Sequence, residues 1–479
     1  MPILYDMSRH LIIILSIILS IWMSGCEDFN DFSTNPAYRL HFSQDTLSLD
    51  TILTEIPTAT HKLMVYNPQA ENLRISSIRL SSNGSSGYRI NVDGIAGNNF
   101  QNIYLAGKDS MYIFVEATLP YQHTPNVRLM EDSILFSVNN DQQAIILQSF
   151  AQDAVIMRGK TISKDTTIQE ERPILIYDSL CIAPNTRLTL SAGSKLYFHH
   201  QAYLSVRGQL NVVGTMENPV LFRGDRTDRL FSYLPYDRLP GQWGGIILEK
   251  ESSGNVIQHA DIHGSEFGIR CIGNNLEDIQ LTLEHSIITQ VNHNGLACIN
   301  SKAVIGNCEI SNAGQHAVFL QGGDYAFTHC TLANHFSWNI RKGYALFFTN
   351  TSDEDTAHPL QKADFRNCLI SGSFSDELYA VQHKDESIAF NYYFSHSLLH
   401  TVESGSEAFI NNKWQQEEHF KNIDDKHQLF DFSLTSSSAA IDCGLNDDAQ
   451  YYPTDRKGVS RLEDDAPDAG CYEFQTNVK

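Results

Sequence analysis

The chain has 479 residues, enough for two or three domains, and its 42% hydrophobic content is normal for a globular protein with a packed core. Its formal net charge of −22 argues against binding to nucleic acid, which requires clustered Lys and Arg side chains. The same charge disfavours attraction to acidic polysaccharides, unless a local basic patch or a metal ion overrides it.

The N-terminus has the pattern of a secretory signal. Arg9 and His10 precede an apolar run over residues 11–22, which is too short for a membrane-spanning helix of roughly 20 residues. The small residues that end in Gly25-Cys26 resemble a bacterial lipobox. The resemblance implies that residues 1–25 are a lipoprotein signal peptide and that Cys26 carries the lipid. A secreted protein with an incidental Cys26 is the alternative.

A lipid anchor determines the location of the protein, because several acyl chains together hold a protein stably on a membrane. The acidic residues Glu27, Asp28 and Asp31 follow Cys26, and such a stretch resembles the surface-export signal of some gram-negative lipoproteins. We therefore expect a lipid anchor in the outer membrane, with the protein on the cell surface. In that oxidising compartment the other eight cysteines are able to form disulfides, although their even number does not require it.

Two regions with different sequence patterns follow. Residues 26–40 are polar and are predicted to be a tether, whereas residues 41–155 alternate short apolar strands with polar turns. This spacing, without helical periodicity, predicts an antiparallel β-sandwich. The region resembles the immunoglobulin-like domains found ahead of surface modules, and it contains no cysteine. The predicted strands lie at 63–66, 75–80, 111–115, 134–138 and 144–147.

A six-residue template recurs in the second half of the chain: large apolar, any, His or Asn, small, any, aliphatic. It begins at Ile257, Leu283, Ile305, Phe327, Phe365 and Phe394, at spacings of 22 to 38 residues. A period of about 22 residues fits one coil of a parallel β-helix, with loops in the longer gaps. We therefore predict an all-β protein with a parallel β-helix over residues 175–475.

Coils of a β-helix stack roughly 4.8 Å apart, so equivalent positions form columns. The fourth residue of the template is always small, which predicts a column that points into the coil. The third residue is His or Asn, which predicts a polar ladder at a bend. Stacked imidazoles do not converge on one point, so a structural ladder is favoured over a metal site. The predicted ladder is His259, His285, Asn307, His329, Asn367 and His396, and the predicted buried thiols are Cys271, Cys298, Cys308, Cys330 and Cys368.

Three further stretches resemble right-handed parallel β-helix proteins of the pectate-lyase-like superfamily, specifically their repeat-containing surface lipoproteins. They are 188–198 with 204–210 and 214–215, the Pro240-Gly241-Gln242-Trp243-Gly244-Gly245-Ile246 segment, and the terminal motifs at 440–444, 455–461 and 467–474. The resemblance implies a fold, and not an activity. It also implies a C-terminal cap, which would cover the open strand edge of the last coil. The family often has Ala where this chain has Cys443 and Cys471, which implies a disulfide between them; two separate thiols are the alternative.

The sequence contains few candidates for catalysis. Asp261 and Glu309 share the outward column two coils apart, roughly 9.6 Å, at the far edge of the range for an inverting carboxylate pair. A solvated face is the simpler interpretation. His263 and Glu266 follow Asp261 and enrich the cluster slightly. We predict no cofactor, although the acidic loop Asp353-Glu354-Asp355 has carboxylates of the kind that bind Ca²⁺.

A long insertion between coils, Arg223 to Trp243, is the most attractive binding surface. Aromatic faces stack on sugar rings and Arg side chains bind carboxylates or hydroxyls. The predicted ligand-binding residues are Arg226, Arg229, Tyr233, Tyr236 and Arg238, and Trp243 is predicted to be structural. The alternative is a structural role, in which the loop buries its own aromatic rings.

These observations favour a surface-anchored, non-catalytic lipoprotein whose β-helix binds or adheres to a partner, with a polysaccharide as the possible ligand. A polysaccharide lyase or glycoside hydrolase on the same helix is the rival hypothesis. A purely structural envelope component is the third. The sequence names neither the ligand nor the oligomeric state.

Overall fold

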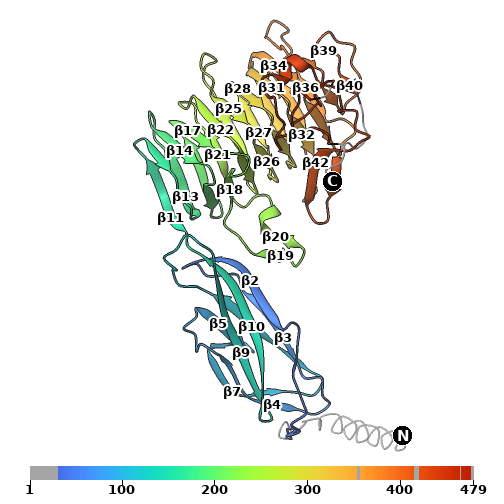
Figure 1. The fold of residues 1–479 in the computed structure, drawn as a ribbon. Helices are drawn as coiled ribbons and strands as arrows, with labels where there is room; N and C mark the ends of the chain where they lie inside the picture. The colour runs from blue at the N-terminus through green and yellow to red at the C-terminus, as the bar shows by residue number, and fades with distance from the viewer. Residues whose placement is uncertain (1–30, 353–355, 415–419, 464, 476–479) are drawn as a thin grey trace, which may run out of the picture. The chain divides into compact units, whose positions relative to one another are not determined.

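The computed structural model describes residues 31–352, 356–414, 420–463 and 465–475. Within these residues the regular secondary structure is β, apart from the single-turn elements η1 (Tyr236–Arg238) and α2 (Asn446–Ala449). The chain divides into two compact units (Figure 1). The first comprises residues up to 151 without 123–126, and the second comprises 123–126 and 152–479.

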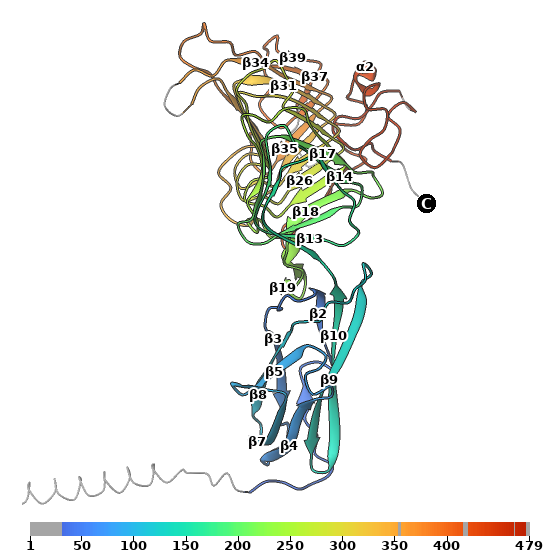
Figure 2. The same ribbon diagram turned by 90° about the vertical axis from the view of Figure 1, so that its left-hand side faces the viewer.

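The first unit contains two five-stranded sheets, which form the two layers in Figure 2. One sheet has the order β1 (His41–Phe42), β3 (His61–Tyr66), β8 (Ser110–Ala117), β5 (Tyr88–Val92), β6 (Ile95–Gly97). The other has the order β2 (Thr46–Leu53), β10 (Asp141–Gln152), β9 (Arg128–Val138), β4 (Leu73–Leu80), β7 (Asn99–Leu105). All five predicted strands are present.

Alternation along the strands builds the core of this unit. On β8, Ile113 and Val115 are fully buried while Tyr112 and Phe114 face outward, as the two-residue period of a strand requires. Neighbouring strands such as β3 and β8 pair antiparallel. Part of the predicted tether is packed, because Phe32 stacks on Tyr104 with ring centroids 4.8 Å apart.

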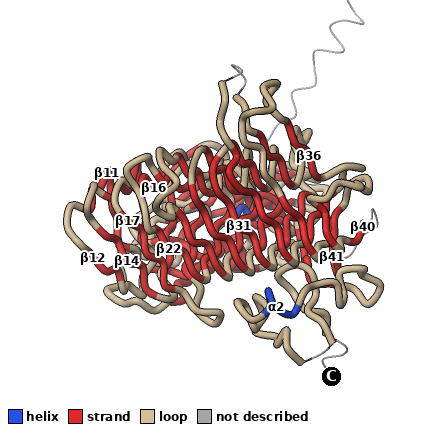
Figure 3. Tube along the Cα trace, turned by 90° about the horizontal axis from the view of Figure 1, so that it is seen from above, coloured by secondary structure: helices blue, strands red, loops and turns tan. Residues whose placement is uncertain are grey.

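The second unit consists of long parallel sheets with the coil connectivity of a β-helix, visible as rows of strands in Figure 3. Each full coil contributes one strand to each of three columns, here named A, B and C. Column A is β12 (Thr166–Ile168), β14 (Arg187–Ser191), β17 (Gln209–Val213), β22 (Asn255–Gln258), β25 (Leu281–Glu284), β28 (Lys302–Gly306), β31 (Gly323–Thr328), β34 (Leu360–Arg366), β37 (Tyr393–Ser395), β39 (Phe409–Ile410).

Columns B and C are joined in one 18-stranded sheet. Column B is β15 (Lys195–Phe198), β18 (Val220–Gly224), β23 (Ala260–His263), β26 (Ile287–Thr289), β29 (Glu309–Ser311), β32 (Thr331–Asn334), β35 (Leu369–Gly372), β38 (Leu398–Leu399), β40 (Lys413–Trp414). Column C is β16 (Tyr203–Val206), β21 (Gly245–Leu248), β24 (Ile269–Ile272), β27 (Leu296–Ile299), β30 (Val318–Gln321), β33 (Leu346–Thr349), β36 (Leu378–Val381). The first two strands, β11 (Val155–Ile162) and β13 (Ile174–Ile182), run through both columns, since β13 pairs with β15 and with β16.

The parallel sheets begin earlier than residue 175, because β11 already pairs in parallel with β13 from Val155 onward. The predicted inward columns are confirmed. Cys308, Cys330 and Cys368 are fully buried, as are Ile288 and Ile310 two positions from their small neighbours. Cys271 and Cys298 are also buried and lie opposite each other on adjacent coils.

The predicted ladder lies at a left-handed bend between columns A and B. All six residues have φ between 49° and 53°, a conformation that costs most residues energy but suits Asn and His. The side chains bond along the stack: His259 and His285 stack at 4.7 Å, and Asn307 Nδ2 donates to His285 Nδ1 at 2.8 Å. Asn367 Nδ2 donates to His329 Nε2 at 2.9 Å. Polar side chains thus satisfy one another where the backbone turns.

The C-terminal segment differs from the predicted end cap. It lies along one flank of the coils, where α2 is seen beside the strand rows in Figure 3. Leu445 N donates to Asn367 Oδ1 at 2.9 Å, and Asn307 Nδ2 donates to the carbonyl of Thr454 at 3.0 Å. The antiparallel hairpin β41 (Phe420–Asp424) and β42 (Leu429–Leu434) supplies Phe432 to a cluster over the outward Leu398. Apolar outward positions in the last coils explain why this flank is covered.

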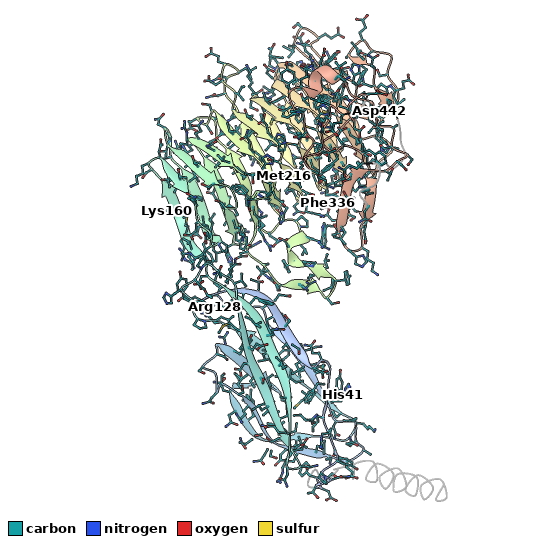
Figure 4. All side chains as sticks on the ribbon, viewed as in Figure 1. His41, Arg128, Lys160, Met216, Phe336 and Asp442 are labelled. Atoms are coloured by element: carbon teal, nitrogen blue, oxygen red, sulfur yellow. The ribbon has the colours of Figure 1, made fainter. Side chains whose placement is uncertain are left out.

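The predicted Cys443–Cys471 disulfide is wrong for this structure, in which both are free thiols. Cys443 lies against the backbone of Lys413, whereas Cys471 N donates to Thr331 Oγ1 at 3.0 Å. The two segments that carry these cysteines are neighbours, because Ala469 N donates to the carbonyl of Ala440 at 3.0 Å and Gly444 N donates to that of Pro467 at 2.8 Å. The segments therefore pair through their backbones, and the two sulfur atoms stay unlinked. Figure 4 labels Asp442, the residue that precedes Cys443, on the opposite side of the second unit from Lys160 of β11.

Changing His285 tests the ladder. His285→Ala places an alanine at φ 51° and should lower the free energy of unfolding by about 1–3 kcal/mol. His285→Asn should cost much less, because Asn occupies the equivalent positions 307 and 367. Urea unfolding of the two variants checks this; equal losses would contradict a conformational role for the ladder.

The same position predicts a pH dependence. Burial, aided by the neighbouring His259, lowers the pKa of His285 to about 4. The unfolded chain therefore takes up a proton near pH 6.5 that the folded chain takes up only near pH 4, so stability present above pH 6.5 is lost as the pH falls toward 4. Between pH 7.5 and 5, His285→Asn should lose less stability than the wild type. An equal loss in both would contradict this assignment.

Alkylation tests the two thiols. Under denaturing, non-reducing conditions, mass spectrometry should find Cys443 and Cys471 each alkylated on separate peptides, with the same yield whether or not the protein was first reduced. A linked peptide pair that appears only without reduction would contradict the geometry.

Candidate functional site

A cleft of about 450 Å³ lies on the outward face of column B, at the coils that contain β23, β26 and β29. Its floor contains Asp261, Ile287 and Glu309, which are in register on consecutive coils. The walls come from the insertion before β21, from the β41–β42 hairpin and from the C-terminal flank. These walls supply Asp237, Arg238, Gln428, Leu429, Phe430, Asp431, Phe432, Lys457 and Tyr472.

Asp261 belongs to a cluster of charged side chains on the cleft floor. The Nδ1 atom of His263 lies 2.8 Å from Asp261 Oδ1, and its Nε2 atom lies 2.9 Å from Asp237 Oδ1. Arg223 Nε lies 2.9 Å from the same oxygen of Asp237. Two carboxylates therefore flank one imidazole, and the strand β23 and the insertion are held together through it.

The electrostatics of this cluster favour the charged forms of His263, Asp261 and Asp237. Burial by itself would lower the pKa of His263, but the charges of Asp261 and Asp237 outweigh it and raise that pKa to about 10. Burial by itself would raise the pKa of Asp261, yet the charge and hydrogen bond of His263 hold it below its ordinary value. The pKa of Asp237 is lowered in the same way.

Glu309 has the opposite environment. Its side chain is almost completely buried, with 7% exposure. Tyr472 donates a 2.5 Å hydrogen bond to Oε2, and Ser311 donates a 3.0 Å hydrogen bond to Oε1. Burial raises the pKa of Glu309 above its ordinary value, against the opposing effects of Arg456 and of these hydrogen bonds. The two carboxyl groups of the floor are thus shifted in opposite directions.

The insertion and the terminal hairpin meet beside the cleft, although 189 residues separate them in sequence. Arg238 Nη1 donates to the carbonyl of His427 at 2.7 Å. The ring of Tyr233 meets the ring of His427 edge-on, with centroids 5.3 Å apart. His427 precedes Gln428, which lines the cleft, so the tip of the insertion forms part of the cleft rim. This tip contains β19 (Arg229–Phe231) and β20 (Leu234–Pro235), which are labelled in Figure 1.

The predicted ligand-binding residues of the insertion divide into two groups. Arg226 forms an ion pair with Asp228 at 2.5 Å and stacks over Tyr236 at 3.9 Å, and Arg238 is bound to the hairpin, so these three stabilise the insertion itself. Tyr233 and Arg229 face solvent, and Arg229 Nη1 donates to the carbonyl of Ser232.

Phe231, which the sequence analysis did not select, is the most exposed ring of the insertion. It is 54% exposed, and its ring lies nearly parallel to that of Tyr233, at an angle of 15° and 5.6 Å between centroids. Two neighbouring flat rings at a cleft rim suit the face of a sugar ring.

Other predicted residues have structural roles. Trp243 is buried, stacks on Phe198 at 4.2 Å and donates to the carbonyl of His263 at 2.9 Å, which confirms its structural assignment. Glu266 does not join Asp261 but pairs with His293 at 2.9 Å. Residues 1–30, including Cys26, and the acidic loop 353–355 lie outside the described residues.

The described part of the chain contains no group of three or more His, Cys, Asp or Glu side chains with the geometry of a metal site. It also contains no helix long and apolar enough to cross a membrane.

Comparisons with known proteins add little to this description. No protein-family model matches the chain, and no curated protein matches it. Among solved structures, pectate lyase Pel9A is 14% identical over 68% of this chain and 88% of its own chain, with a TM-score of 0.30. A protein of unknown function from Porphyromonas gingivalis W83 is 12% identical over 26% of this chain and 60% of its own chain, with a TM-score of 0.18.

A family 123 glycoside hydrolase from Clostridium perfringens is 8% identical over 24% of this chain, with a TM-score of 0.18. The match covers 26% of that enzyme, so this chain spans well under two thirds of its length. At such TM-scores the likenesses carry no argument about activity. The strand pairing of the chain itself defines an all-β protein whose long parallel sheets resemble a β-helix.

Proposed function

We propose that this protein binds a saccharide in the cleft on the outward face of column B. The observation that carries the proposal is the convergence of three distant segments, the coils at 261–309, the insertion and the terminal hairpin, on one cavity of about 450 Å³. Its polar groups, among them Thr289, Gln290 and Gln428, suit sugar hydroxyls, and a cavity of this size is typical of ligand sites.

We further propose that the protein works at the cell surface of a gram-negative bacterium, lipidated on Cys26 and held in the outer membrane. The lipobox-like Gly25-Cys26 and the acidic residues after it support this part of the proposal. The first unit then acts as an immunoglobulin-like spacer that presents a right-handed β-helix, the hand that parallel strand crossovers strongly favour.

A second candidate function, hydrolysis of the bound saccharide by inversion, is favoured by the opposite pKa shifts of Asp261 and Glu309. A carboxyl group of raised pKa suits the role of acid, and one of lowered pKa suits the role of base. Asp261 would accept a proton from water while the water oxygen attacks the anomeric carbon. Glu309 would give its proton to the departing glycosidic oxygen as that carbon–oxygen bond breaks. The spacing of two coils, about 9.6 Å between backbones, lies at the edge of the range for such pairs.

The rim rings provide a test of binding. Taking about 1 kcal/mol for each ring that stacks on a sugar, the double variant Phe231→Ala, Tyr233→Ala should weaken binding about 30-fold. Tyr451→Ala is the matched control, because Tyr451 is 78% exposed and does not line the cleft. A glycan array followed by calorimetry on the best ligand checks this. Equal affinity of the double variant and the control would contradict a role for the rim.

The carboxyl groups provide a test of hydrolysis. The soluble form from residue 27 should release new reducing ends from the saccharide it binds, with activity lost as the pH rises through the raised pKa of Glu309. Asp261→Asn and Glu309→Gln should each lower the rate at least about 100-fold, the usual contribution of a general acid or base. Binding without any reducing ends, in a folded sample, would leave the first proposal intact and remove the second.

A further inference from the structure

Arg456 belongs to the C-terminal flank of the coils and lies beside the wall of the cleft. Its backbone N donates to the carbonyl of Cys471 at 3.0 Å, and the next residue, Lys457, lines the cleft. Its Nη1 atom donates to the hydroxyl oxygen of Tyr472 at 3.3 Å, and Tyr472 donates to Glu309 Oε2 at 2.5 Å. One tyrosine hydroxyl therefore joins the guanidinium to a carboxyl group of the cleft floor.

Arg456 differs from two buried arginines of the same unit, because it has no carboxylate partner. Arg341 forms an ion pair with Glu377 at 2.6 Å, and Arg461 forms one with Glu473. Among the described residues, the tyrosine hydroxyl is the only acceptor for the side chain of Arg456, whose Nε atom is buried without one, like those of the other two. A half-buried cation that no carboxylate pairs with costs free energy, so fold stability does not explain its presence.

The charge of Arg456 acts on both carboxyl groups of the cleft floor. Burial raises the pKa of Glu309, and Arg456 is the largest of the effects that lower it. Burial by itself would also raise the pKa of Asp261, and first His263 and then Arg456 lower it. One cation thus favours the ionised form of each of these two groups, which lie on different coils.

Arg456 is the cation with the largest effect on Glu309. The other titratable groups that act on Glu309 or feel its charge are Asp261, Tyr472 and the thiol of Cys471, and none of these is cationic. The positive charge on this side of the floor therefore comes from a residue that does not itself line the cleft.

Hydrolysis by inversion requires negative charge on both carboxyl groups, at different moments. Asp261 must be ionised before it accepts a proton from the attacking water. Glu309 becomes a carboxylate as its proton passes to the departing glycosidic oxygen. A fixed cation beside the place where charge develops stabilises the transition state without reorganisation of solvent.

We infer that Arg456 is a positioning residue for hydrolysis in the cleft. Its charge stabilises the carboxylate that forms on Glu309, and its hydrogen bond holds the hydroxyl of Tyr472 against that carboxylate. The inference rests on the proposed hydrolysis and gives a role in it to an arginine outside the cleft lining.

Kinetics of Arg456→Met and Arg456→Lys in the soluble form from residue 27 test the inference. The probe is whichever of xylan, mannan, β-glucan and polygalacturonate oligosaccharides releases most reducing ends. Arg456→Met should lower kcat at least about tenfold with KM little changed, because one preorganised charge is lost outside the cleft lining. Without the cation the pKa values of Asp261 and Glu309 both rise, so both limbs of the pH profile should move to higher pH. Arg456→Lys keeps the charge and should keep both limbs in place.

Two further measurements separate this role from a structural one. Arg456→Met should melt no lower than the wild type, because it removes a cation that has no ion-pair partner; a marked fall in melting temperature would count against the inference. Arg207→Met is the matched control, since it makes the same change in net charge at the surface ion pair with Glu251, outside the cleft lining. It should leave kcat and both limbs of the pH profile unchanged.

A measurement without substrate separates the inference from the proposal beneath it. Carboxyl ¹³C NMR, with the signal of Glu309 assigned through Glu309→Gln, should give a higher titration midpoint in Arg456→Met than in the wild type. An unchanged midpoint, or unchanged limbs of the pH profile in an active variant, would overturn the inference while hydrolysis stands. A folded wild type that releases no reducing ends from any probe would overturn both.

Discussion

Every functional feature of the second unit depends on one constraint: successive coils pair in parallel and in register, roughly 4.8 Å apart. This pairing turns each position of the template into a column that runs along the unit. Small and aliphatic side chains stack inside, His and Asn stack at the left-handed bend, and one outward column contains Asp261 and Glu309 on coils two steps apart. A shift of one residue in any coil would exchange inward and outward positions.

The columns were predictable from the sequence because they are local and repeated. Residues such as Cys308 and His285 reveal their places through the equivalent residues of neighbouring coils. Asp261 and Glu309 could be placed on one outward column for the same reason. Their surroundings could not be predicted, because Tyr472 reaches Glu309 across 163 residues and Arg238 reaches the hairpin across 189. No repeat in the sequence predicts such contacts. The two terminal segments do pair, through Ala469 N and the carbonyl of Ala440, but the sequence could not show that Cys443 and Cys471 remain free thiols.

The cleft exists because the outward face of column B is covered unevenly. In the later coils Leu369 and Leu398 are apolar, and the C-terminal flank packs on them. In the earlier coils the insertion crosses the same face and is tied to β23 through His263. The uncovered stretch between these two covers holds polar and ionised groups. Structural contacts at either side thus position the groups that line the cleft.

Hydrogen–deuterium exchange of the soluble form, with and without a saturating concentration of a saccharide that binds it, tests the central claim most directly. Binding in the cleft predicts slower exchange in three segments that are distant in sequence: 229–238 of the insertion, 260–263 with 287–290 on the coils, and 424–432 of the hairpin. Slower exchange confined to any other face of the protein, or no change with a ligand that calorimetry shows to bind, would contradict the account.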